Sequence, residues 1–155
     1  MGLPNYTVYM NSIKIQAQPL PVGASPLPLP GGLASVRAGF PSPAEDLGGQ
    51  RIDLGRVLIT HPQATFVLRA RGTSMVGVGI FDDDLLVVNR ALQARHQSIV
   101  VAVVDGEFTV KTLYQRAGRV KLQAANPACP DIEPAEGQTL EIWGVVTAAI
   151  HQFAY

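Results

Sequence analysis

A mainly β fold with an extended N-terminal arm is the class that this sequence predicts. From Ile52 onward short apolar segments alternate with turn signals, Asp105-Gly106 has the composition of a tight hairpin turn, and no long amphipathic helix occurs. A chain of 155 residues suits one compact domain of antiparallel strands with an appendage. Hydrophobic residues make up 47% and charged residues 15%, which is typical of a globular protein.

The appendage is the N-terminal part of the chain, up to about residue 45. Gln18–Gly32 contains prolines at positions 19, 21, 26, 28 and 30, a composition that favours extended, polyproline-like backbone. Before it, Tyr6–Ile15 alternates weakly between apolar and polar residues. Two interpretations of this earlier segment stay open: a frayed terminus, or a strand that docks on this or another subunit.

The remainder of the chain supplies the strands. The hairpin turn at Asp105-Gly106 separates two of them by two residues, and Gly tolerates the positive φ that such a turn needs. Ile99–Val104 is apolar on both faces and is therefore expected at the centre of the sheet. Ile52–Leu58 is expected to form a short helix. The six expected strands are Thr65–Ala70, Asp84–Asn89, Ile99–Val104, Glu107–Leu113, Val120–Ala124 and Leu140–Ala149.

Charge and cysteine usage restrict the function and the compartment. The 12 basic and 12 acidic residues balance, which argues against tight, purely electrostatic binding of nucleic acid. Cys129 is the only cysteine, so no internal disulfide can form, and this fits a reducing cytosol. No signal peptide and no run of roughly 20 apolar residues is apparent, so we expect a cytoplasmic protein without a membrane span.

Ser74 and Lys111 are the residues that most invite a chemical interpretation. Ser74 lies in Gly72-Thr73-Ser74-Met75, directly after an apolar segment, and Lys111 is one of three lysines and sits in an apolar strand. A serine hydroxyl needs a base to become a good nucleophile, and lysine can be that base when burial keeps its amine neutral. Taken singly, each residue also fits a structural role, Ser74 in a turn and Lys111 on the outer face of a strand.

Other candidate sites are weaker. His61, His96 and His151 stand in loops or polar stretches and are expected at the surface, although the sequence alone leaves a Ser-His-Asp site open. The acidic run at residues 82–84 could suggest a metal site, but it lacks histidine or further spaced carboxylates. A turn with solvated charges is the better interpretation, and no metal is expected.

Several segments, taken together, resemble the LexA/UmuD family of self-cleaving serine-lysine proteases. The similarity covers about residues 37–150, and three separate motifs follow in the family's order at suitable spacing. The nucleophile segment is Gly72–Met75 with Gly79–Val88, and the segment that carries the lysine base is Asp105–Lys111. The cleavage-site segment is Ala38–Ala44, and Arg51–Leu54 is one further match. Two positions depart from the pattern, Asp83 where Gly is frequent and Asn89 where Asp is common, and both lie outside the proposed chemistry.

The resemblance implies a reaction and a fold. It implies a compact protease domain of twisted antiparallel strands that hydrolyses the chain's own Ala38–Gly39 bond, with Ser74 as nucleophile and Lys111 as general base. Backbone N–H groups of Ser74 and Thr73 would hold the oxyanion. Residues 1–38 would be the arm removed, residues 39–155 would form the protease and polymerase-accessory domain, and no cofactor is implied.

The length of the arm favours the UmuD branch of the family over the repressor branch. Only 38 residues precede the expected cut, and they are proline-rich and lack the helical periodicity of a helix-turn-helix domain. The branch implies a homodimer, stimulation by a RecA–single-stranded-DNA filament, and a UmuC-type translesion polymerase as partner of the trimmed form. Alternatives are a non-enzymatic interaction module and a remnant repressor, whereas a signal peptidase is disfavoured by the lack of a membrane anchor.

Overall fold

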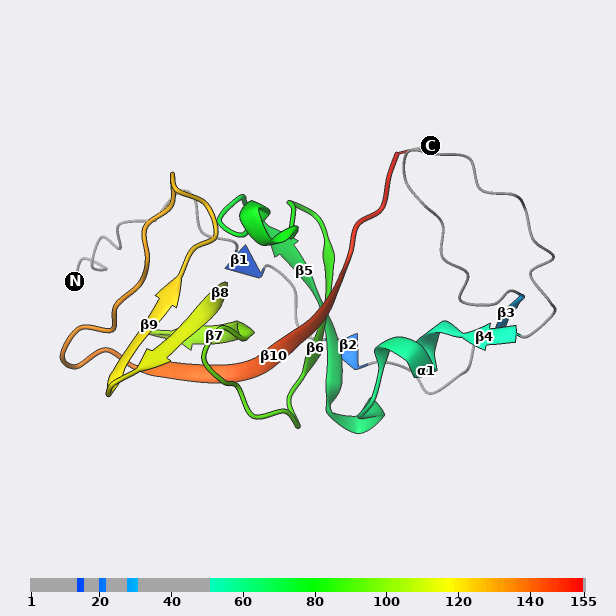
Figure 1. Ribbon diagram of the computed structural model, residues 1–155, viewed down its shortest axis with the longest axis horizontal. Helices are drawn as coiled ribbons and strands as arrows, with labels where there is room; N and C mark the ends of the chain where they lie inside the picture. The colour runs from blue at the N-terminus through cyan, green and yellow to red at the C-terminus, as the bar shows by residue number, and fades with distance from the viewer. Residues whose placement is uncertain (1–13, 16–19, 22–27, 31–50, 155) are drawn as a thin grey trace, which may run out of the picture.

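The computed structural model describes residues 14–15, 20–21, 28–30 and 51–154, and their fold is mainly antiparallel β (Figure 1). Within these residues no helix is long and apolar enough to cross a membrane. The elements are β1 (Lys14–Ile15), β2 (Leu20–Pro21), β3 (Pro28–Pro30), β4 (Arg51–Asp53), α1 (Leu54–Leu58), η1 (Pro62–Ala64), β5 (Thr65–Arg71), η2 (Val76–Val78), β6 (Leu85–Asn89), β7 (Ile99–Val104), β8 (Glu107–Arg116), β9 (Arg119–Gln123) and β10 (Leu140–Ile150).

All six strands predicted from the sequence are confirmed, within a few residues at their ends. β7 has the predicted bounds, and β8 continues three residues further than predicted, to Arg116. The hairpin between them is the predicted one, because Val104 pairs with Glu107 and the two turn residues have positive φ, 49° at Asp105 and 84° at Gly106. The alternation of apolar residues and the two turn residues therefore determine the β7–β8 hairpin from local sequence alone.

The predicted helix Ile52–Leu58 begins later than expected. Ile52 and Asp53 belong to β4, which pairs with β3 in a separate two-stranded sheet. Helix α1 starts at Leu54, and the Asp53 side chain caps it by accepting a hydrogen bond from the Arg56 backbone N–H at 3.2 Å. The prediction was wrong at its first two residues because the strand partner lies more than 20 positions upstream.

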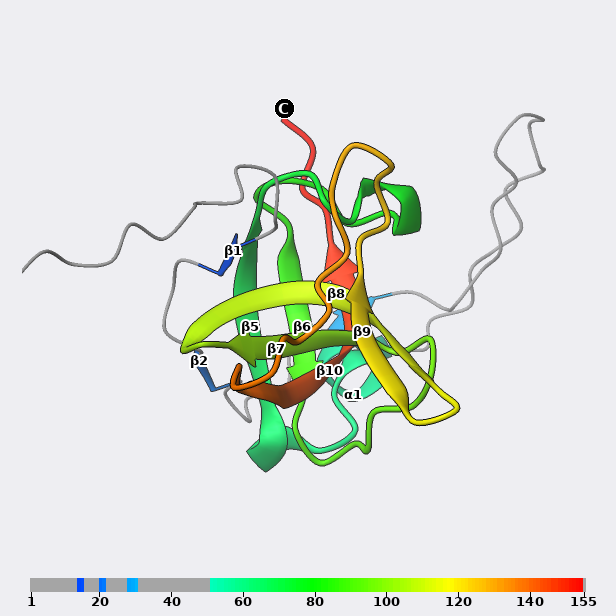
Figure 2. The ribbon, with the colours of Figure 1, turned by 90° about the vertical axis from the view of Figure 1, so that its left-hand side faces the viewer.

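The main sheet closes on itself through the arm. Its strands run in the order β1-β5-β6-β10-β7-β8-β9, and β1 pairs with β8 as well as with β5. The pairings therefore form a ring from β1 through β5, β6, β10, β7 and β8 back to β1, with β9 as an outer strand. In Figure 2 the strands β7, β8 and β10 run across β5 and β6, as expected for a strongly twisted sheet.

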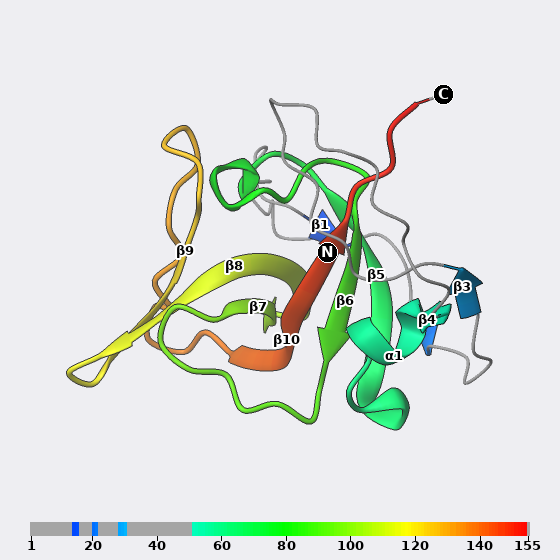
Figure 3. The ribbon, with the colours of Figure 1, turned by 45° about the vertical axis from the view of Figure 1, so that its right-hand side comes forward.

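Strand β10 connects the part of the ring that contains β5 and β6 to the part that contains β7 and β8 (Figure 3). Its residues 140–145 pair with β7 and its residues 145–150 pair with β6, with a shift of register in each ladder. Bulges of this kind bend a strand, which lets β10 serve both parts of the sheet. Gly144 is buried at the first shift, where the strand passes between its two partners.

Two apolar clusters lie on opposite faces of the central strand. β7 was predicted to be central, and it lies between β10 and β8 with its side chains alternating between the clusters. The larger cluster comprises Leu68, Ala70, Met75, Ile80, Leu86, Val88, Val101 and Val110. The smaller one comprises Val100, Ala102, Leu113 and Leu122.

The end of the segment Tyr6–Ile15, for which the sequence left two interpretations open, is described in the structure. Lys14–Ile15, the end of the weakly alternating segment, forms a strand that docks on this subunit by pairing with β5 and β8. Further along, β2 pairs with the first half of β5 and β3 pairs with β4. The expected cleavage site, Ala38 and Gly39, lies outside the described residues.

A Cβ atom added at Gly144 would lie 2.7 Å from Cγ1 of Val88, a stiff β-branched side chain with no exposed surface. We expect Gly144→Ala to lower the free energy of unfolding by about 1–3 kcal/mol, the usual cost of overpacking a core. Urea denaturation followed by tryptophan fluorescence measures it.

Gly55→Ala is the matched control for this change. Its added Cβ would meet only the flexible tip of Asp53, at 3.1 Å, and the residue lies in helix α1. Its effect should stay within about 1 kcal/mol, because alanine favours a helix. Equal stabilities for the Gly144→Ala protein and the unsubstituted protein would contradict the close packing of β10 against β6.

Candidate active site

Ser74 lies in the turn that follows β5. The strand ends at Arg71, and Gly72 then adopts a φ of 102°, a conformation that favours glycine. The Gly72 backbone N–H donates to Oδ1 of Asp82 at 2.7 Å, which fixes the point where the chain leaves the sheet. Ser74 and Met75 then lead into η2, and Met75 is anchored in the larger apolar cluster.

The far side of this turn is held by a segment about 50 residues later in the chain. The Ala125 backbone N–H donates to the Ser74 carbonyl at 2.8 Å, and the Gly77 N–H donates to the Ala125 carbonyl at 2.7 Å. Asn126 donates from Nδ2 to the Thr73 carbonyl at 2.9 Å. A Cβ at Gly77 would lie 2.4 Å from the Ala125 oxygen, so this close approach requires glycine. The serine is therefore held on rigid backbone at both ends of its turn.

Lys111 reaches the serine from β8. Its Nζ donates to Ser74 Oγ at 2.9 Å, to Thr109 Oγ1 at 3.2 Å and to the Val110 carbonyl at 3.1 Å. Both Lys111 and Ser74 have 0% exposed surface. Because side chains alternate along a strand, Thr109 and Lys111 project from the same face of β8. The amine thus has three acceptors, which match the three N–H donors of an ammonium group.

Burial changes the acidity of this lysine. Desolvation lowers the pKa of Lys111 from its ordinary 10.5 to about 8, with an opposing, smaller effect from the charges of Cys129 and Asp131. Its cross-strand neighbour on β7 is Val100, which has no exposed surface either. An amine with this pKa can take and return a proton near neutral pH, which is the property that a general base needs.

The structure brings together two of the predicted site residues that lie 37 positions apart, Ser74 and Lys111. Thr73 precedes Ser74 in the same turn, and its carbonyl is the group that Asn126 holds. Thr109 and Asn126 were not singled out from the sequence. Thr109 could have been found from its position two residues before Lys111 on one strand face, whereas the contact of Asn126 spans 53 residues and has no local signal.

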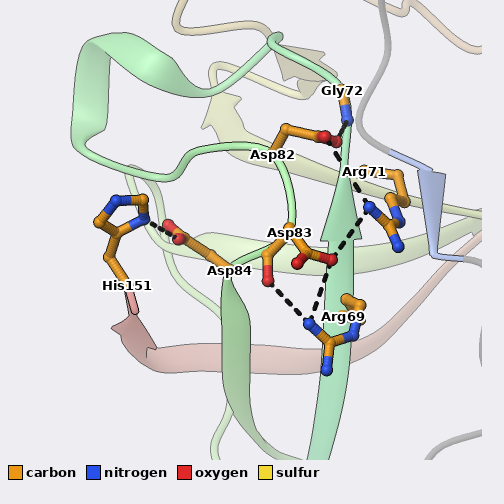
Figure 4. Close-up of polar contacts among 7 residues, drawn as sticks. All are labelled: Arg69, Arg71, Gly72, Asp82, Asp83, Asp84 and His151. Atoms are coloured by element: carbon orange, nitrogen blue, oxygen red, sulfur yellow. Dashed lines mark hydrogen bonds and ion pairs between the residues drawn. The ribbon is translucent and has the colours of Figure 1, made fainter. Parts of the chain in front are cut away.

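The acidic run forms the turn beside this loop (Figure 4). Asp83 lies 3.1 Å from Arg69 and 2.9 Å from Arg71, and Asp82 lies 3.8 Å from Arg71. Asp83 has a φ of 72°, which explains why glycine suits this position, and aspartate tolerates the conformation better than most residues. These exposed pairs are each worth about 0–1 kcal/mol, so they offset the strain without adding much stability.

Asp84 corrects the prediction of three solvated charges. Its side chain is 1% exposed, accepts a hydrogen bond from the Phe81 N–H at 2.8 Å, and lies 2.6 Å from Nδ1 of His151 (Figure 4). The prediction held for Asp82 and Asp83 and was wrong for Asp84. The sequence could not show this, because the partner histidine is 67 residues away.

Each of the three histidines has contacts of its own. His61 is exposed, as predicted, and lies 2.9 Å from Nδ2 of the buried Asn89. His96 is partly buried against Tyr114 and accepts a hydrogen bond from the Gln115 N–H at 3.2 Å. His151 packs between Phe81 and Phe153 at the end of β10.

Comparison with known proteins relates the sequence of this chain to one family. Residues 28–147 match the family model described as Peptidase S24-like. Protein SamA of Salmonella typhimurium is 48% identical over 115 residues, which are 74% of this chain and 79% of SamA. Protein MucA of Escherichia coli is 45% identical over 120 residues, covering 76% and 81% of the two chains. The LexA repressor of Dechloromonas aromatica is 47% identical over 102 residues, 66% of this chain and 49% of the repressor.

The lowered pKa of Lys111 predicts how stability depends on pH. Between about pH 8 and 10.5 the unfolded chain holds a proton on this lysine that the folded chain lacks, so stability rises with pH in this window. Below pH 8 the folded protein must bury an ammonium group, at a cost of about 3 kcal/mol. In a Ser74→Ala background, which removes the candidate nucleophile, urea unfolding should therefore give a larger free energy at pH 10 than at pH 7.5.

The control is the double variant Ser74→Ala/Lys111→Met, in which an apolar side chain of similar length replaces the lysine. Titration of other groups affects both proteins alike, so the difference between the two pH profiles isolates Lys111. The double variant should lack the rise of up to about 3 kcal/mol. Parallel profiles for the two proteins would mean that the amine keeps its ordinary pKa in the folded state.

Proposed function

The chain belongs to the Peptidase S24-like family, and we propose that it is a UmuD-like protein of the SOS response that cuts its own Ala38–Gly39 bond. In this proposal Ser74 is the nucleophile and Lys111 is the general base. The observation that carries it is the 2.9 Å hydrogen bond between Lys111 Nζ and Ser74 Oγ, both without exposed surface. Nucleophile and base within hydrogen-bond reach are the diagnostic geometry of covalent catalysis.

The proposed reaction has two steps. First, the neutral Lys111 amine takes the Ser74 hydroxyl proton while Oγ bonds to the Ala38 carbonyl carbon, and the tetrahedral intermediate then expels the Gly39 amine, which receives that proton. Second, water attacks the ester between Ser74 and Ala38 with Lys111 again as base, which frees Ser74 and leaves residues 1–38 with a new carboxylate. The methyl side chain of Ala38 and the lack of a side chain at Gly39 would let the backbone approach the nucleophile closely.

The acidity of Lys111 suits this role. With a pKa of about 8, about one-tenth of the molecules carry a neutral amine at pH 7, compared with fewer than one in a thousand for an ordinary lysine. Three acceptors around Nζ orient the amine toward the serine. Thr109 is thus a proposed positioning residue, since it would act on the reaction through Lys111.

Stabilisation of the oxyanion is assigned to backbone N–H groups of Ser74 and Thr73. Donors fixed in advance are worth most in catalysis, because they need no reorganisation when charge develops. Support for this assignment comes from the anchoring of the turn by Asp82, Ala125 and Asn126, which keeps its backbone in place.

The biological role that we propose follows from the family branch. Cleavage would remove residues 1–38, and residues 39–155 would act in the cytoplasm as a homodimeric accessory subunit of a UmuC-type, error-prone translesion polymerase. A RecA–single-stranded-DNA filament would stimulate the cut. The balance of 12 basic and 12 acidic residues supports a protein that reaches DNA through protein partners.

Incubation of the purified protein at alkaline pH should produce a fragment whose N-terminal residue is Gly39. The rate should rise with pH and level off above a midpoint of about 8, where Lys111 becomes neutral. Mass spectrometry identifies the fragment, and a series of buffers from pH 6 to pH 11 gives the profile.

Ser74→Ala and Lys111→Ala are the matched controls, and both should stay intact. A Ser74→Ala protein that still cuts at residue 38 would exclude the proposed nucleophile. A wild-type protein that stays intact both at pH 10 and with RecA filament would favour a module that works uncleaved.

Thr109→Val tests the proposed positioning role. Loss of the hydroxyl removes one acceptor from the amine, worth roughly 1 kcal/mol, so the limiting rate at alkaline pH should fall about fivefold. The midpoint of the pH profile should also move to lower pH, because the lost acceptor favoured the charged amine. Thr109→Ser keeps the hydroxyl and should restore both values, whereas an unchanged midpoint for Thr109→Val would assign Thr109 a packing role only.

A further inference from the structure

The serine–lysine pair is closed to a substrate in this structure. Ser74, Lys111 and Met75 have no exposed surface, and Thr109 is 6% exposed. For reaction, a peptide carbonyl carbon must come within roughly 3 to 3.5 Å of Ser74 Oγ. Some segment that now lies beside the pair must therefore move before the Ala38–Gly39 bond can reach it.

Strand β1 is the segment in contact with both sides of the site. Lys14 pairs with Arg71, the last residue of β5 before the nucleophile turn, and Ile15 pairs with Ala70. On its other side Lys14 pairs with Thr109, two residues before Lys111. This two-residue strand thus fills the seam between the strand that leads to Ser74 and the strand that carries Lys111.

The other edges of these two strands are already paired. One edge of β8 pairs with β7. Along the other edge of β8, β9 pairs with Thr112–Arg116 and β1 pairs with Thr109. One edge of β5 pairs with β6. Along the other edge of β5, β2 lies beside Phe66 and Val67, and β1 lies beside Ala70 and Arg71. Among the described residues, the seam is therefore where an extended segment beside the site would find backbone partners.

We propose that Lys14–Ile15 is an intramolecular plug, which occupies the seam that the chain's own scissile segment must enter before it is cut. The inference rests on the proposed self-cleavage and adds to it a binding site for extended peptide, formed by the edge of β5 at Arg71 and the edge of β8 beside Thr109. The plug and the scissile segment compete for one site, and self-cleavage requires exchange of the first for the second.

The energetics allow this exchange. Each backbone hydrogen bond is worth about 0.5–1.5 kcal/mol net, so a two-residue strand adds little stability and opens often. Ile15 and Ala38 are 23 positions apart, a length that can span roughly 75 Å when extended, so the scissile segment can reach the seam. Both competitors are tethered to the domain and so act at effective concentrations in the millimolar range.

Lys14→Pro and Ile15→Pro test the plug. Proline keeps an extended φ but removes the backbone N–H, and successive N–H groups of a strand point to opposite edges, so the two variants probe the β5 and β8 sides. We expect either variant to accelerate self-cleavage of the full-length chain at pH 10 by about three- to tenfold. Quantified gel bands over time give the rate constant.

Leu20→Pro is the matched control. It removes an N–H from the same arm, in β2, but that strand pairs with Val67 near the opposite end of β5 from the nucleophile turn. Its rate should stay within twofold of wild type. Lys14→Pro and Ile15→Pro rates no higher than those of Leu20→Pro would overturn the plug, while the absence of cleavage in every variant would instead contradict the proposed function.

A second measurement does not depend on cleavage. In the uncut Ser74→Ala protein, amide hydrogen exchange at Arg71 should accelerate at least threefold when Ile15→Pro or Lys14→Pro is added. The Ala70 N–H donates to the Asp84 carbonyl, so the next N–H along β5, that of Arg71, points to the β1 side. The urea midpoint of the Ser74→Ala protein should stay the same, which shows that the domain remains folded. Unchanged exchange at Arg71 would mean that β1 does not protect the seam, and the proposal would fail.

Discussion

A lysine side chain with no exposed surface is the constraint on which the rest of this structure depends. Holding its ammonium form in the fold costs about 3 kcal/mol below pH 8, a large part of the stability of a small domain. Three acceptors around Nζ limit that cost, and Val100 and Leu113 keep water away from the same face of β8. Exposure of the amine would return its pKa toward 10.5, so the packing of this strand face and its chemistry cannot be separated.

The lysine meets the serine at the place where the two ends of the sheet come together. Along the ladder, β5 and β8 are separated by β6, β10 and β7, yet β1 brings the two ends of that path together. The nucleophile turn leaves the end of β5 at this meeting point. Its own anchors come from elsewhere in the sequence, Asp82 at its start and Ala125 with Asn126 on its far side. The site is thus assembled from segments far apart in the sequence rather than from any single motif.

This explains what the sequence could and could not predict. The strands were predictable because alternation and the Asp105-Gly106 turn are local, and Lys111 stood out because a lysine in an apolar strand needs a partner. Helix α1 was placed two residues too early, Asp84 was taken as solvated, and Asn126 was missed, since each depends on a partner more than 20 positions away. The partners of such long-range contacts are decided by the whole fold, so they cannot be predicted from a short stretch of neighbouring residues.

Closure of the ring by β1 also suggests a reason why a protein of this kind would cut only one peptide bond. β1, β2 and β3 all precede residue 38, so the proposed reaction would release the strand that closes the ring on the same fragment as Ala38. Before the cut, tethering keeps both near the site at millimolar effective concentration, and after the cut that advantage is lost when the fragment dissociates. In this proposal the domain that remains would lack its substrate and would have open edges on β5 and β8. Unpaired strand edges are templates for an extended segment of another chain, so the proposed cleavage would both end the protease reaction and create a surface for assembly.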